Sequence, residues 1–260
     1  RVVFFGTPAF VDPVLKKLEE NFDVIKAIRT PEQFNNETIE QLKSLNPDLF
    51  VVASYGQILP GKLLEIPKFG SINIHPSLLP KYRGPSPVQS AILNGDKKTG
   101  VTFIKMDEEI DHGPIISQFE EEILETDTFE TLAVRLFSKS AESLTDIVKR
   151  FAEDQMAKVQ DDSKATFTKQ INKQDGYIDL KSSNSLKIEN LKLKIRAYYP
   201  WPGVWTKYQI SNIKYQIINQ IIKLLPDEKI QVEGKSSMSY KDFINGYSEG
   251  KEFLKKLNLI

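Results

Sequence analysis

The sequence has 260 residues, of which 40% are hydrophobic and 27% are charged, and it contains two histidines and no cysteine. A chain of this length can bury the core of one large domain or of two. The lack of cysteine excludes disulfides, thiolate nucleophiles and cysteine-ligated zinc, and two histidines are too few for a histidine-rich metal site, so we expect no metal. The sequence has no apolar run of about 18 residues and no signal-like start, so we expect a cytoplasmic protein without membrane association.

The charge of the chain is zero overall but unevenly distributed. Residues 190–260 carry 12 lysines and arginines against 6 aspartates and glutamates, a net charge of +6, so residues 1–189 carry −6. A basic C-terminal part favours a polyanionic partner. A lysine-rich solvated surface explains the same charge equally well, so charge alone leaves both interpretations open.

The first half of the chain alternates short apolar runs with amphipathic segments. Runs rich in β-branched and aromatic residues predict strands, and apolar residues at helical spacing predict helices. We expect strands at residues 1–6, 23–28, 47–54, 71–75, 99–106 and 114–123. We expect helices at residues 8–20, 35–46, 86–95 and 128–154, and we expect an asparagine to cap the start of the second. This alternation predicts an α/β fold, a doubly wound, mostly parallel, Rossmann-like sheet with helices on both faces.

The composition changes after residue 155, which we expect to end a first domain spanning residues 1–155. Residues 156–189 are rich in polar and turn residues and predict a linker. Residues 190–260 predict a smaller C-terminal β-rich domain, which we expect to be an OB-like β-barrel. Its apolar runs favour strands, although residues 215–225, YQIINQIIKLL, also fit a helical stripe.

Two polar side chains, Asn73 and His75, occupy alternate positions of the predicted strand 71–75. Alternate residues of a strand share a face, so both side chains should point to the same side. Ligands bind at the carboxyl ends of strands in open α/β sheets, which makes this end of the strand a candidate site. Prolines at positions 76, 80, 85 and 87 restrict the loop that follows.

A carboxylate could join these two side chains from the acidic loop 107–112, which follows the next predicted strand. An amide and an imidazole can donate to a developing oxyanion, and a carboxylate can orient the imidazole, so the set suits attack on a carbonyl or formyl carbon. Each residue also has a structural explanation: a buried histidine with its bonds satisfied, an asparagine that caps a loop, and a solvated acidic turn. The spacing therefore indicates a site but does not name the reaction.

Two longer stretches resemble the signature of the folate-dependent formyltransferases, namely residues 73–84, NIHPSLLPKYRG, and residues 100–117, GVTFIKMDEEIDHGPIIS. Three further stretches agree with this family: FFGTPAFVDPVLKKL at 4–18, ASYGQILP at 53–60 and YYPWPGVWT at 198–206. Over nearly its full length the sequence is similar to the branch of the family that formylates methionyl initiator tRNA.

This resemblance implies transfer of a formyl group from 10-formyltetrahydrofolate to the α-amine of methionyl initiator tRNA, in support of translation initiation. It implies a formyltransferase catalytic domain at residues 1–155 and a tRNA-binding role for residues 190–260. It also implies that Asn73 and His75 hold the formyl oxygen as it becomes anionic. Asp111 would orient the imidazole and help, through water, to move the proton of the attacking amine.

The resemblance also implies residues that bind the folate and the substrate. The expected folate-binding residues are Ser77, Leu78, Leu79 and Pro80, together with Tyr55, Gly56, Gln57 and Ile58. The expected substrate-binding residues are Gly6, Thr7, Pro8 and Arg83. Arg83 could instead brace its loop through carboxylates or carbonyls. We expect a monomer that uses no metal.

The sequence departs from the family between Ile28 and Arg29, where the family has a longer segment with a basic loop that reaches the tRNA acceptor end. The part after Thr206 is also shorter than expected, so the residues that contact tRNA are left unassigned. Two alternatives stay open: a formyltransferase that acts on a sugar-nucleotide amine, and a catalytically silent tRNA-binding protein on the same scaffold. A steep salt dependence of binding would favour tRNA over a sugar nucleotide.

Overall fold

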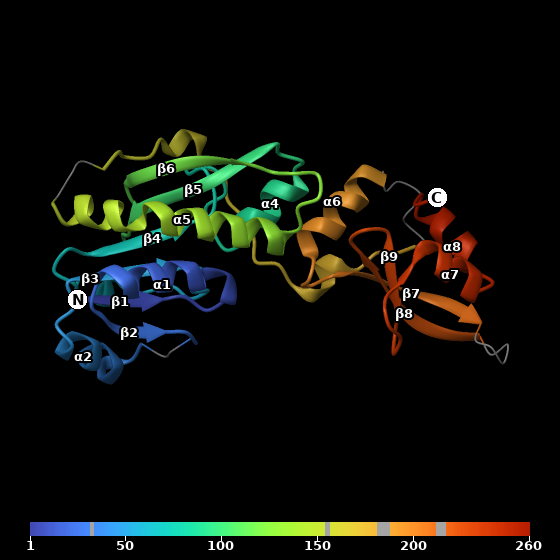
Figure 1. Ribbon diagram of the computed structural model, residues 1–260, viewed down its shortest axis with the longest axis horizontal. Helices are drawn as coiled ribbons and strands as arrows, with labels where there is room; N and C mark the ends of the chain where they lie inside the picture. Colours follow the sequence, from blue (N-terminus) through green and yellow to red (C-terminus); the bar gives the residue numbers. More distant parts are fainter. Residues whose placement is uncertain (32–33, 154–156, 181–187, 212–216) are drawn as a thin grey trace. The chain divides into compact units, whose positions relative to one another are not determined.

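The structure is a computed structural model that describes residues 1–31, 34–153, 157–180, 188–211 and 217–260 (Figure 1). The chain forms two compact units. The first comprises Arg1–Ala91, Lys97–Ile123 and Thr131–Gln170, and the second comprises Ile92–Asp96, Leu124–Glu130 and Ile171–Ile260. The sequence placed boundaries at residues 155 and 189, whereas here the polar segment between them is divided between the two units at Gln170.

The first unit is built on a six-stranded sheet with the strand order β2-β1-β3-β4-β5-β6 (Figure 1). Its first four strands pair in parallel, whereas β5 runs antiparallel to both β4 and β6. The strands are β1 (Val2–Phe5), β2 (Val24–Ile28), β3 (Leu49–Ala53), β4 (Ser71–His75), β5 (Lys98–Lys105) and β6 (Ile115–Glu122). The α/β Rossmann-like class is confirmed, and the sheet is mostly parallel as expected, because five of its six strands run in one direction and only β5 is reversed. The short connection between β5 and β6 contains no crossover helix, which a parallel pair would require.

The predicted helices of the first half are present, with shifted ends. They are α1 (Asp12–Asn21), α2 (Asn36–Ser44), α4 (Pro87–Leu93) and α5 (Phe129–Ala152), with a 3₁₀ turn at Ala9–Val11 before α1. The structure adds a short helix that the sequence did not predict, α3 (Gly61–Leu64). The side chain of Asn35 caps α2 by accepting from the backbone N–H of Thr38 at 2.9 Å, as its position before the helix predicts. The long α5 buries a stripe of apolar residues at helical spacing.

The core on one face of this sheet positions the loop after β3. Residues at alternate positions of β1 and β3 pack there against α2 and α3, namely Val3, Phe5, Phe50 and Val52 with Leu42 and Leu63. The cluster also contains Tyr55 and Leu59 from the loop after β3, and both are nearly fully buried. Packing of these two side chains holds the loop against the sheet, so that its backbone is a fixed wall for whatever lies beside it.

The second unit contains a four-stranded antiparallel sheet with the order β10-β9-β8-β7. The strands are β7 (Val204–Ser211), β8 (Ile217–Leu225), β9 (Lys229–Val232) and β10 (Met238–Ser239). Residues 217–225 of the ambiguous apolar run are therefore a strand, and its first two residues, 215–216, lie outside the described residues. The sequence did not predict the helices α6 (Ile188–Tyr198), α7 (Tyr240–Gly246) and α8 (Gly250–Lys256). Closure of the sheet into an OB-like barrel stays a prediction.

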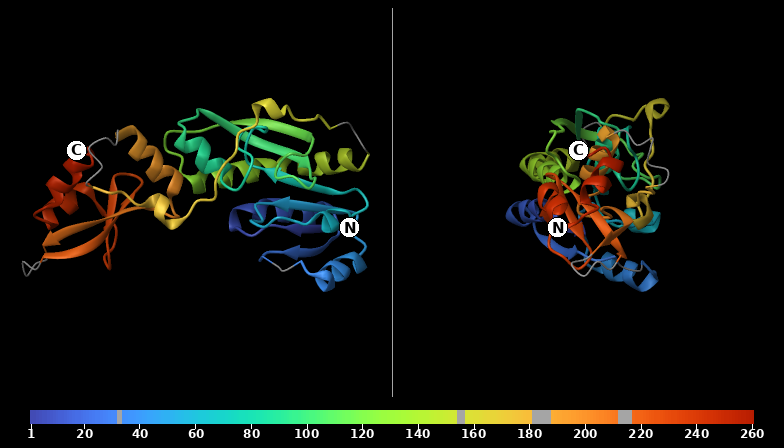
Figure 2. Two further views of the ribbon diagram at one scale, coloured as in Figure 1. Left: turned by 180° about the vertical axis from the view of Figure 1, so that it is seen from behind. Right: turned by 90° about the vertical axis from the view of Figure 1, so that its right-hand side faces the viewer.

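Residues 158–168, which we name the strap, were expected to be part of a linker but are bonded to the first unit. Lys158 exchanges two backbone hydrogen bonds of 2.8 Å with Ile115. Further along, Arg83 N–H donates to the Thr166 carbonyl, and Thr168 N–H donates to the Arg83 carbonyl, both at 2.8 Å. The strap can be followed in yellow in Figure 2. The segment has a polar, linker-like composition because its partners are backbone groups and the Arg83 side chain of other segments, which leave no pattern in its own sequence.

Within the described residues, no helix combines the length and the apolar character needed to cross a membrane.

Gly113 is expected to be essential for the stability of the first unit. A Cβ at this position would overlap the backbone carbonyl oxygen of Lys105, which cannot move without disrupting β5. We therefore expect Gly113→Ala to lower the free energy of unfolding by about 1–3 kcal/mol, the usual cost of overpacking. Urea unfolding measures the change. Gly61→Ala is the matched control, because its Cβ would meet only the flexible end of the Glu108 side chain. Equal stability of the two variants would contradict the expectation.

Candidate active site

A cavity of about 430 Å³ lies between the loop after β3 and the loop that joins β5 to β6. Its apolar lining includes Tyr55, Leu59 and Met106, and also Ile58 and Ile110, which are 69% and 52% exposed. Cavities of a few hundred Å³ with mostly apolar walls and a few convergent polar groups are typical of small-molecule sites.

The polar groups of this cavity include Asn73, His75 and Asp111. The Asn73 amide donates to Asp111 Oδ1 at 3.0 Å, and His75 Nδ1 lies 3.3 Å from the same oxygen. The backbone N–H of Gly84 donates to Asp111 Oδ2 at 2.8 Å. The structure therefore brings together the three residues that the sequence singled out, and it adds Gly84, which the sequence did not.

The route by which Asp111 reaches Asn73 differs from the one expected for a parallel sheet. Because β5 is antiparallel to β4, it ends at Lys105 opposite Ile72, and Asn73 itself pairs with Ile104. The loop after β5 then returns beside β4, with Asp111 at a φ of 52°, in the left-handed region. Non-glycine residues adopt this region mainly where surrounding contacts hold them there.

Both ring nitrogens of His75 face oxygen atoms. Nε2 lies 3.0 Å from the carbonyl oxygen of Tyr82, and Nδ1 lies beside Asp111. A neutral imidazole has one N–H, so only the doubly protonated ring can donate to both oxygens. The histidine is 4% exposed, which makes a charge here strongly felt by its neighbours. The structure thus presents His75 as a partner of Asp111 and Tyr82 rather than as a donor directed only at substrate.

The predicted folate-binding residues fall into two groups. Tyr55, Gly56, Gln57 and Ile58 all line the cavity. The second group, formed by Ser77, Leu78, Leu79 and Pro80, is not among the lining residues: the hydroxyl of Ser77 donates to the Lys81 carbonyl at 2.7 Å, and Leu79 N–H donates to Thr102 Oγ1 at 3.1 Å. The contacts of the second group hold the loop after β4 in shape, and its contact with folate stays a prediction.

The other predicted substrate residues, Gly6, Thr7 and Pro8, are likewise not among the residues that line this cavity. A Cβ on Gly6 would lie 2.8 Å from the carbonyl oxygen of Ala53, so close packing of β1 against β3 accounts for glycine there. The hydroxyl of Thr7 donates to the Tyr55 carbonyl at 3.0 Å, which ties this turn to the loop after β3. Their role in substrate binding stays a prediction.

The contacts of Arg83 agree with the second of the two roles that the sequence left open, a brace for its loop, and its role in substrate binding stays a prediction. The residue is 4% exposed. Its guanidinium donates to Gln160 Oε1 through Nε at 3.1 Å and Nη2 at 2.8 Å, and Nη2 also donates to Asp162 Oδ1 at 2.7 Å. A buried charge needs such partners. Gln160 had no signal in the sequence, since it lies in the segment expected to be a linker.

Similarity to known proteins identifies the family. A model of the family described as formyl transferase matches residues 2–148, more than half of the chain. The methionyl-tRNA formyltransferase of Caldanaerobacter subterraneus subsp. tengcongensis is 37% identical over 247 residues, which cover 82% of this chain and 79% of that relative. The chain belongs to the methionyl-tRNA formyltransferase family. The resemblance inferred from the motifs is confirmed.

A second member of the family, from Thermodesulfovibrio yellowstonii, is 34% identical over 297 residues that cover 94% of this chain and 95% of the relative. The aligned length exceeds the 260 residues of the chain. The relative therefore has residues without a counterpart here, in agreement with the shorter segments that the sequence showed.

Solved structures support the fold. The methionyl-tRNA formyltransferase of Clostridium thermocellum matches with a TM-score of 0.62 at 21% identity, over 86% of this chain and 98% of that one. A sugar N-formyltransferase from a Shewanella species matches with a TM-score of 0.63 at 20% identity, over 84% of this chain and 95% of that one. Two enzymes with different acceptors thus share the architecture, so the fold alone does not select the acceptor.

Asp111 is expected to make the stability of the first unit depend on pH. Burial raises the pKa of its carboxyl group, but the charge and hydrogen bond of His75, the Gly84 N–H and the charge of Arg83 outweigh burial and hold the pKa below its ordinary value of 3.8. A carboxyl group whose pKa is lowered by folding stabilises the protein above its unfolded-state pKa, and this contribution disappears as the pH falls through the folded-state pKa.

We therefore expect Asp111→Asn to lower the free energy of unfolding near neutral pH, and the difference from wild type to shrink as the pH falls below 3.8. Urea unfolding of both proteins over a pH series measures it. A difference that stays constant down to the most acidic pH would contradict the assignment of the lowered pKa to Asp111.

Proposed function

We propose that the protein transfers a formyl group from 10-formyltetrahydrofolate to the α-amino group of methionyl initiator tRNA. The observation that carries the proposal is the cluster of Asn73, His75 and Asp111 on one cavity, in a chain that belongs to the methionyl-tRNA formyltransferase family. The co-substrate supplies the formyl carbon. The amine nitrogen forms a bond to that carbon while the bond to the folate nitrogen breaks, and the proton lost by the amine is gained by the folate nitrogen.

Asn73 is the group best placed to stabilise the oxyanion. Its amide carries two N–H groups, of which one is directed to Asp111. The second can donate to the formyl oxygen as the oxygen becomes negative, and a donor held in place before the reaction need not reorganise during it. His75 adds a positive charge beside the same site when both of its nitrogens are protonated. Its direct hydrogen bond to the formyl oxygen, which the family resemblance implies, would require exchange of the bond to Tyr82.

Asp111 is the group that accepts the proton of the attacking amine. Its carboxylate accepts from Asn73 and Gly84 and faces His75, so it fixes all three groups around the formyl carbon. With its pKa held low, the group stays ionised at neutral pH and can accept the amine proton through a water molecule.

The cavity fits the flat ring system of a folate. Apolar side chains from two loops, Tyr55, Ile58, Met106 and Ile110, form its walls, and backbone groups of the same loops can pair with a heterocyclic edge. A HypX structure from Aquifex aeolicus, named as a complex with tetrahydrofolic acid, matches this chain with a TM-score of 0.69 at 15% identity. That likeness concerns the fold, so the folate assignment depends on the lining of the cavity and on family membership.

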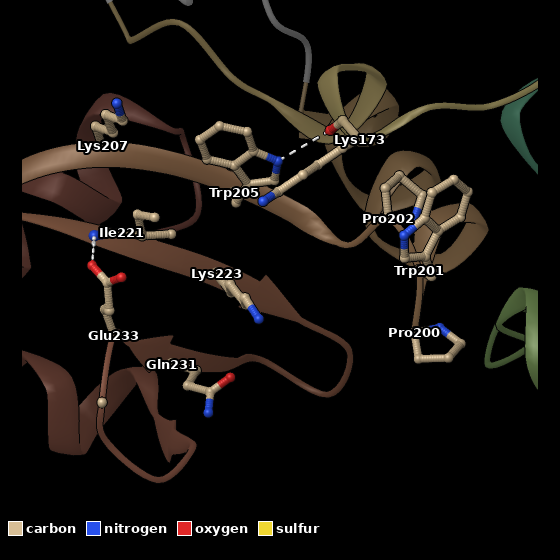
Figure 3. Close-up of a pocket in the computed structure, with 11 residues that line it drawn as sticks. Lys173, Pro200, Trp201, Pro202, Trp205, Lys207, Ile221, Lys223, Gln231 and Glu233 are labelled. Atoms are coloured by element: carbon tan, nitrogen blue, oxygen red, sulfur yellow. Dashed lines mark hydrogen bonds between the residues drawn. The ribbon is translucent and has the colours of Figure 1, made fainter.

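The second unit has a cavity of about 720 Å³, whose lining is the surface that we assign to the tRNA (Figure 3). It lies on the outer face of β7, β8 and β9, where Trp205, Lys207 and Lys223 alternate with buried residues of the same strands. Trp201 is 57% exposed beside it, and Trp205 donates through Nε1 to the Lys173 carbonyl at 3.2 Å. Lysines with exposed aromatic rings are typical of surfaces that bind nucleic acid strands.

The function is tested by incubating the purified protein with 10-formyltetrahydrofolate and one of three acceptors, methionyl initiator tRNA, free methionine or an amino-sugar nucleotide, and measuring N-formyl product. We expect product with the tRNA. Product with the sugar nucleotide and none with the tRNA would replace the proposal by the sugar alternative. Binding of tRNA without any product would instead indicate a catalytically silent tRNA-binding protein.

The lysines of the second cavity are expected to act through the tRNA phosphates. We expect Lys207→Glu combined with Lys223→Glu to raise the KM for methionyl-tRNA by about tenfold or more and to leave the KM for the folate unchanged, because each phosphate that a lysine neutralises contributes to affinity through counterion release. The salt dependence of tRNA binding should become less steep, with a slope smaller by about 0.9 for each phosphate that is no longer neutralised.

The matched control for this double variant is Lys251→Glu with Lys255→Glu, which changes the charge equally at exposed positions of α8 that do not line the cavity. We expect the control to retain most of the tRNA affinity. Equal reductions in affinity in the two double variants would show that only the overall charge of the unit matters.

A further inference from the structure

The side chain of Gln160, in the strap, joins the two loops that carry the catalytic groups. Its amide nitrogen donates to the carbonyl oxygens of Asp111, at 2.9 Å, and Gly113, at 2.8 Å. Its Oε1 accepts both hydrogen bonds from Arg83. The residue is 7% exposed, so these bonds are formed away from bulk water. Four hydrogen bonds from one buried side chain to two separate loops form a strong geometric constraint.

On the Asp111 side, the constraint acts on a turn with an unfavourable backbone conformation. The φ of 52° at Asp111 directs its side chain toward Asn73 and Gly84. Gly113 lies against the Lys105 carbonyl with no room for a Cβ. By donating one N–H to each end of the 111–113 turn, Gln160 fixes the direction of both carbonyls, and hence the orientation of the Asp111 carboxylate.

On the Arg83 side, the constraint acts on the two neighbours of the arginine. The carbonyl oxygen of Tyr82 lies 3.0 Å from His75 Nε2, and the backbone N–H of Gly84 donates to Asp111 at 2.8 Å. Tyr82 and Gly84 have positive φ angles of 63° and 106°. Arg83 is thus the anchor of a strained loop whose backbone binds both His75 and Asp111, and Gln160 supplies the oxygen that accepts two of the anchor's hydrogen bonds.

We propose that Gln160 is a positioning residue for formyl transfer. By linking the 111–113 turn to the 82–84 loop, it holds the side chains of Asp111 and His75 in place relative to each other. The inference rests on the proposed function for its catalytic readout. The alternative is that Gln160 serves only to satisfy the buried charge of Arg83. The two explanations differ because one uses the amide N–H donors and the other uses only the oxygen acceptor.

Three variants separate these explanations. Gln160→Leu removes the donors and the acceptor at similar size. Gln160→Glu keeps an acceptor for Arg83 but turns a carboxylate oxygen toward the Asp111 and Gly113 carbonyls, where donors were. Asp162→Asn is the control, since it weakens the other partner of Arg83 and leaves both contacts of Gln160 with the 111–113 turn in place.

We expect Gln160→Leu and Gln160→Glu each to lower kcat by roughly 10²-fold with little change in the KM for the folate, since a misplacement of about 1 Å has an effect of this size. Asp162→Asn should retain kcat within about twofold. Circular dichroism and thermal unfolding verify that each variant is folded. If Gln160→Leu does not fold, the kcat of Gln160→Glu alone tests the positioning role. Wild-type kcat in Gln160→Glu would overturn the proposal.

The pH profile adds a readout that a purely structural role would leave unchanged. The charged groups that face Asp111 are His75 from β4 and Arg83 from the loop after it, whereas His112 of its own loop faces Asp107 and Asp162. If Asp111 loses its position among these groups, its pKa rises, and the acidic limb of the kcat profile moves to higher pH. We expect this shift in Gln160→Glu and not in Asp162→Asn. An unmoved limb would overturn the proposal.

A readout that does not need activity distinguishes failure of this inference from failure of the proposed function. The chain has two histidines, so its NMR spectrum contains two Hε1 ring signals, which His112→Gln assigns. We expect the His75 signal to move in Gln160→Glu and to stay in place in Asp162→Asn. If wild type transfers no formyl group, the proposed function fails and the His75 signal still tests the link. An unmoved signal would refute the link.

Discussion

Asp111→Asn is expected to lower kcat for formyl transfer by roughly 10²–10⁴-fold, the range typical of general acid–base groups. The carboxylate accepts from Asn73 and Gly84 through its two oxygens and also faces His75. In either orientation of an asparagine amide, its NH₂ group faces donors, so at least one of these contacts becomes repulsive. The variant also lacks the negative charge that receives the amine proton. Single-turnover kinetics with methionyl initiator tRNA measures the chemical step apart from binding.

The control for Asp111→Asn is Asp162→Asn, which makes the same chemical change at a carboxylate that is 62% exposed and contacts Arg83. We expect this control to retain kcat within a few fold. A kcat for Asp111→Asn within tenfold of wild type would show that the carboxylate does not take part in the reaction.

Asn73→Ala is expected to lower kcat by roughly 10²–10³-fold, the reduction seen when a single oxyanion donor is removed. The KM for 10-formyltetrahydrofolate should change little, because the second N–H of the amide becomes important only when the formyl oxygen carries charge. Asn73→Asp tests donation apart from shape, since it keeps the size of the side chain and removes both N–H groups. We expect it to be no more active than Asn73→Ala, and near-wild-type activity of Asn73→Asp would contradict the role of the amide as donor.

Combining Asn73→Ala with Asp111→Asn provides an internal consistency test of these two predictions. The two side chains are hydrogen bonded at 3.0 Å, so their effects should not add. We expect the double variant to be less impaired than the product of the single effects. Strictly additive effects would show that the two groups act independently, and would contradict coupling through their shared hydrogen bond.

The local features of the chain were readable from the sequence. Asn73 and His75 were expected on one face of a strand, and both now lie beside Asp111, because the two-residue period of a strand depends on nothing outside it. The cap of α2 by Asn35 was readable for the same reason. The motifs of the loop after β4 and of the acidic loop also indicated the family, which the similarity to its members confirmed.

Three features of the site were not readable in this way. The antiparallel course of β5 decided how the acidic loop reaches β4. The role of Arg83 followed from its contacts with Gln160 and Asp162, residues far along the chain. The segment that contains Gln160 was expected to be a linker, because a polar stretch whose partners are distant backbone groups has no periodicity of its own.

The sequence by itself determined the alternation of strands and helices, the pairing of an amide with an imidazole on one strand, and the family. These features depend on neighbours along the chain, whose geometry follows from backbone periodicity and local hydrogen bonds. The family resemblance implied Asp111 as the carboxylate, but only the tertiary structure decided how it reaches them, which of the expected residues line the cavity, and that the strap is bonded to two loops. Hydrogen bonds between residues some 80 positions apart, such as that from Tyr82 N–H to Thr166, depend on how the whole unit closes, and no short stretch of sequence encodes them.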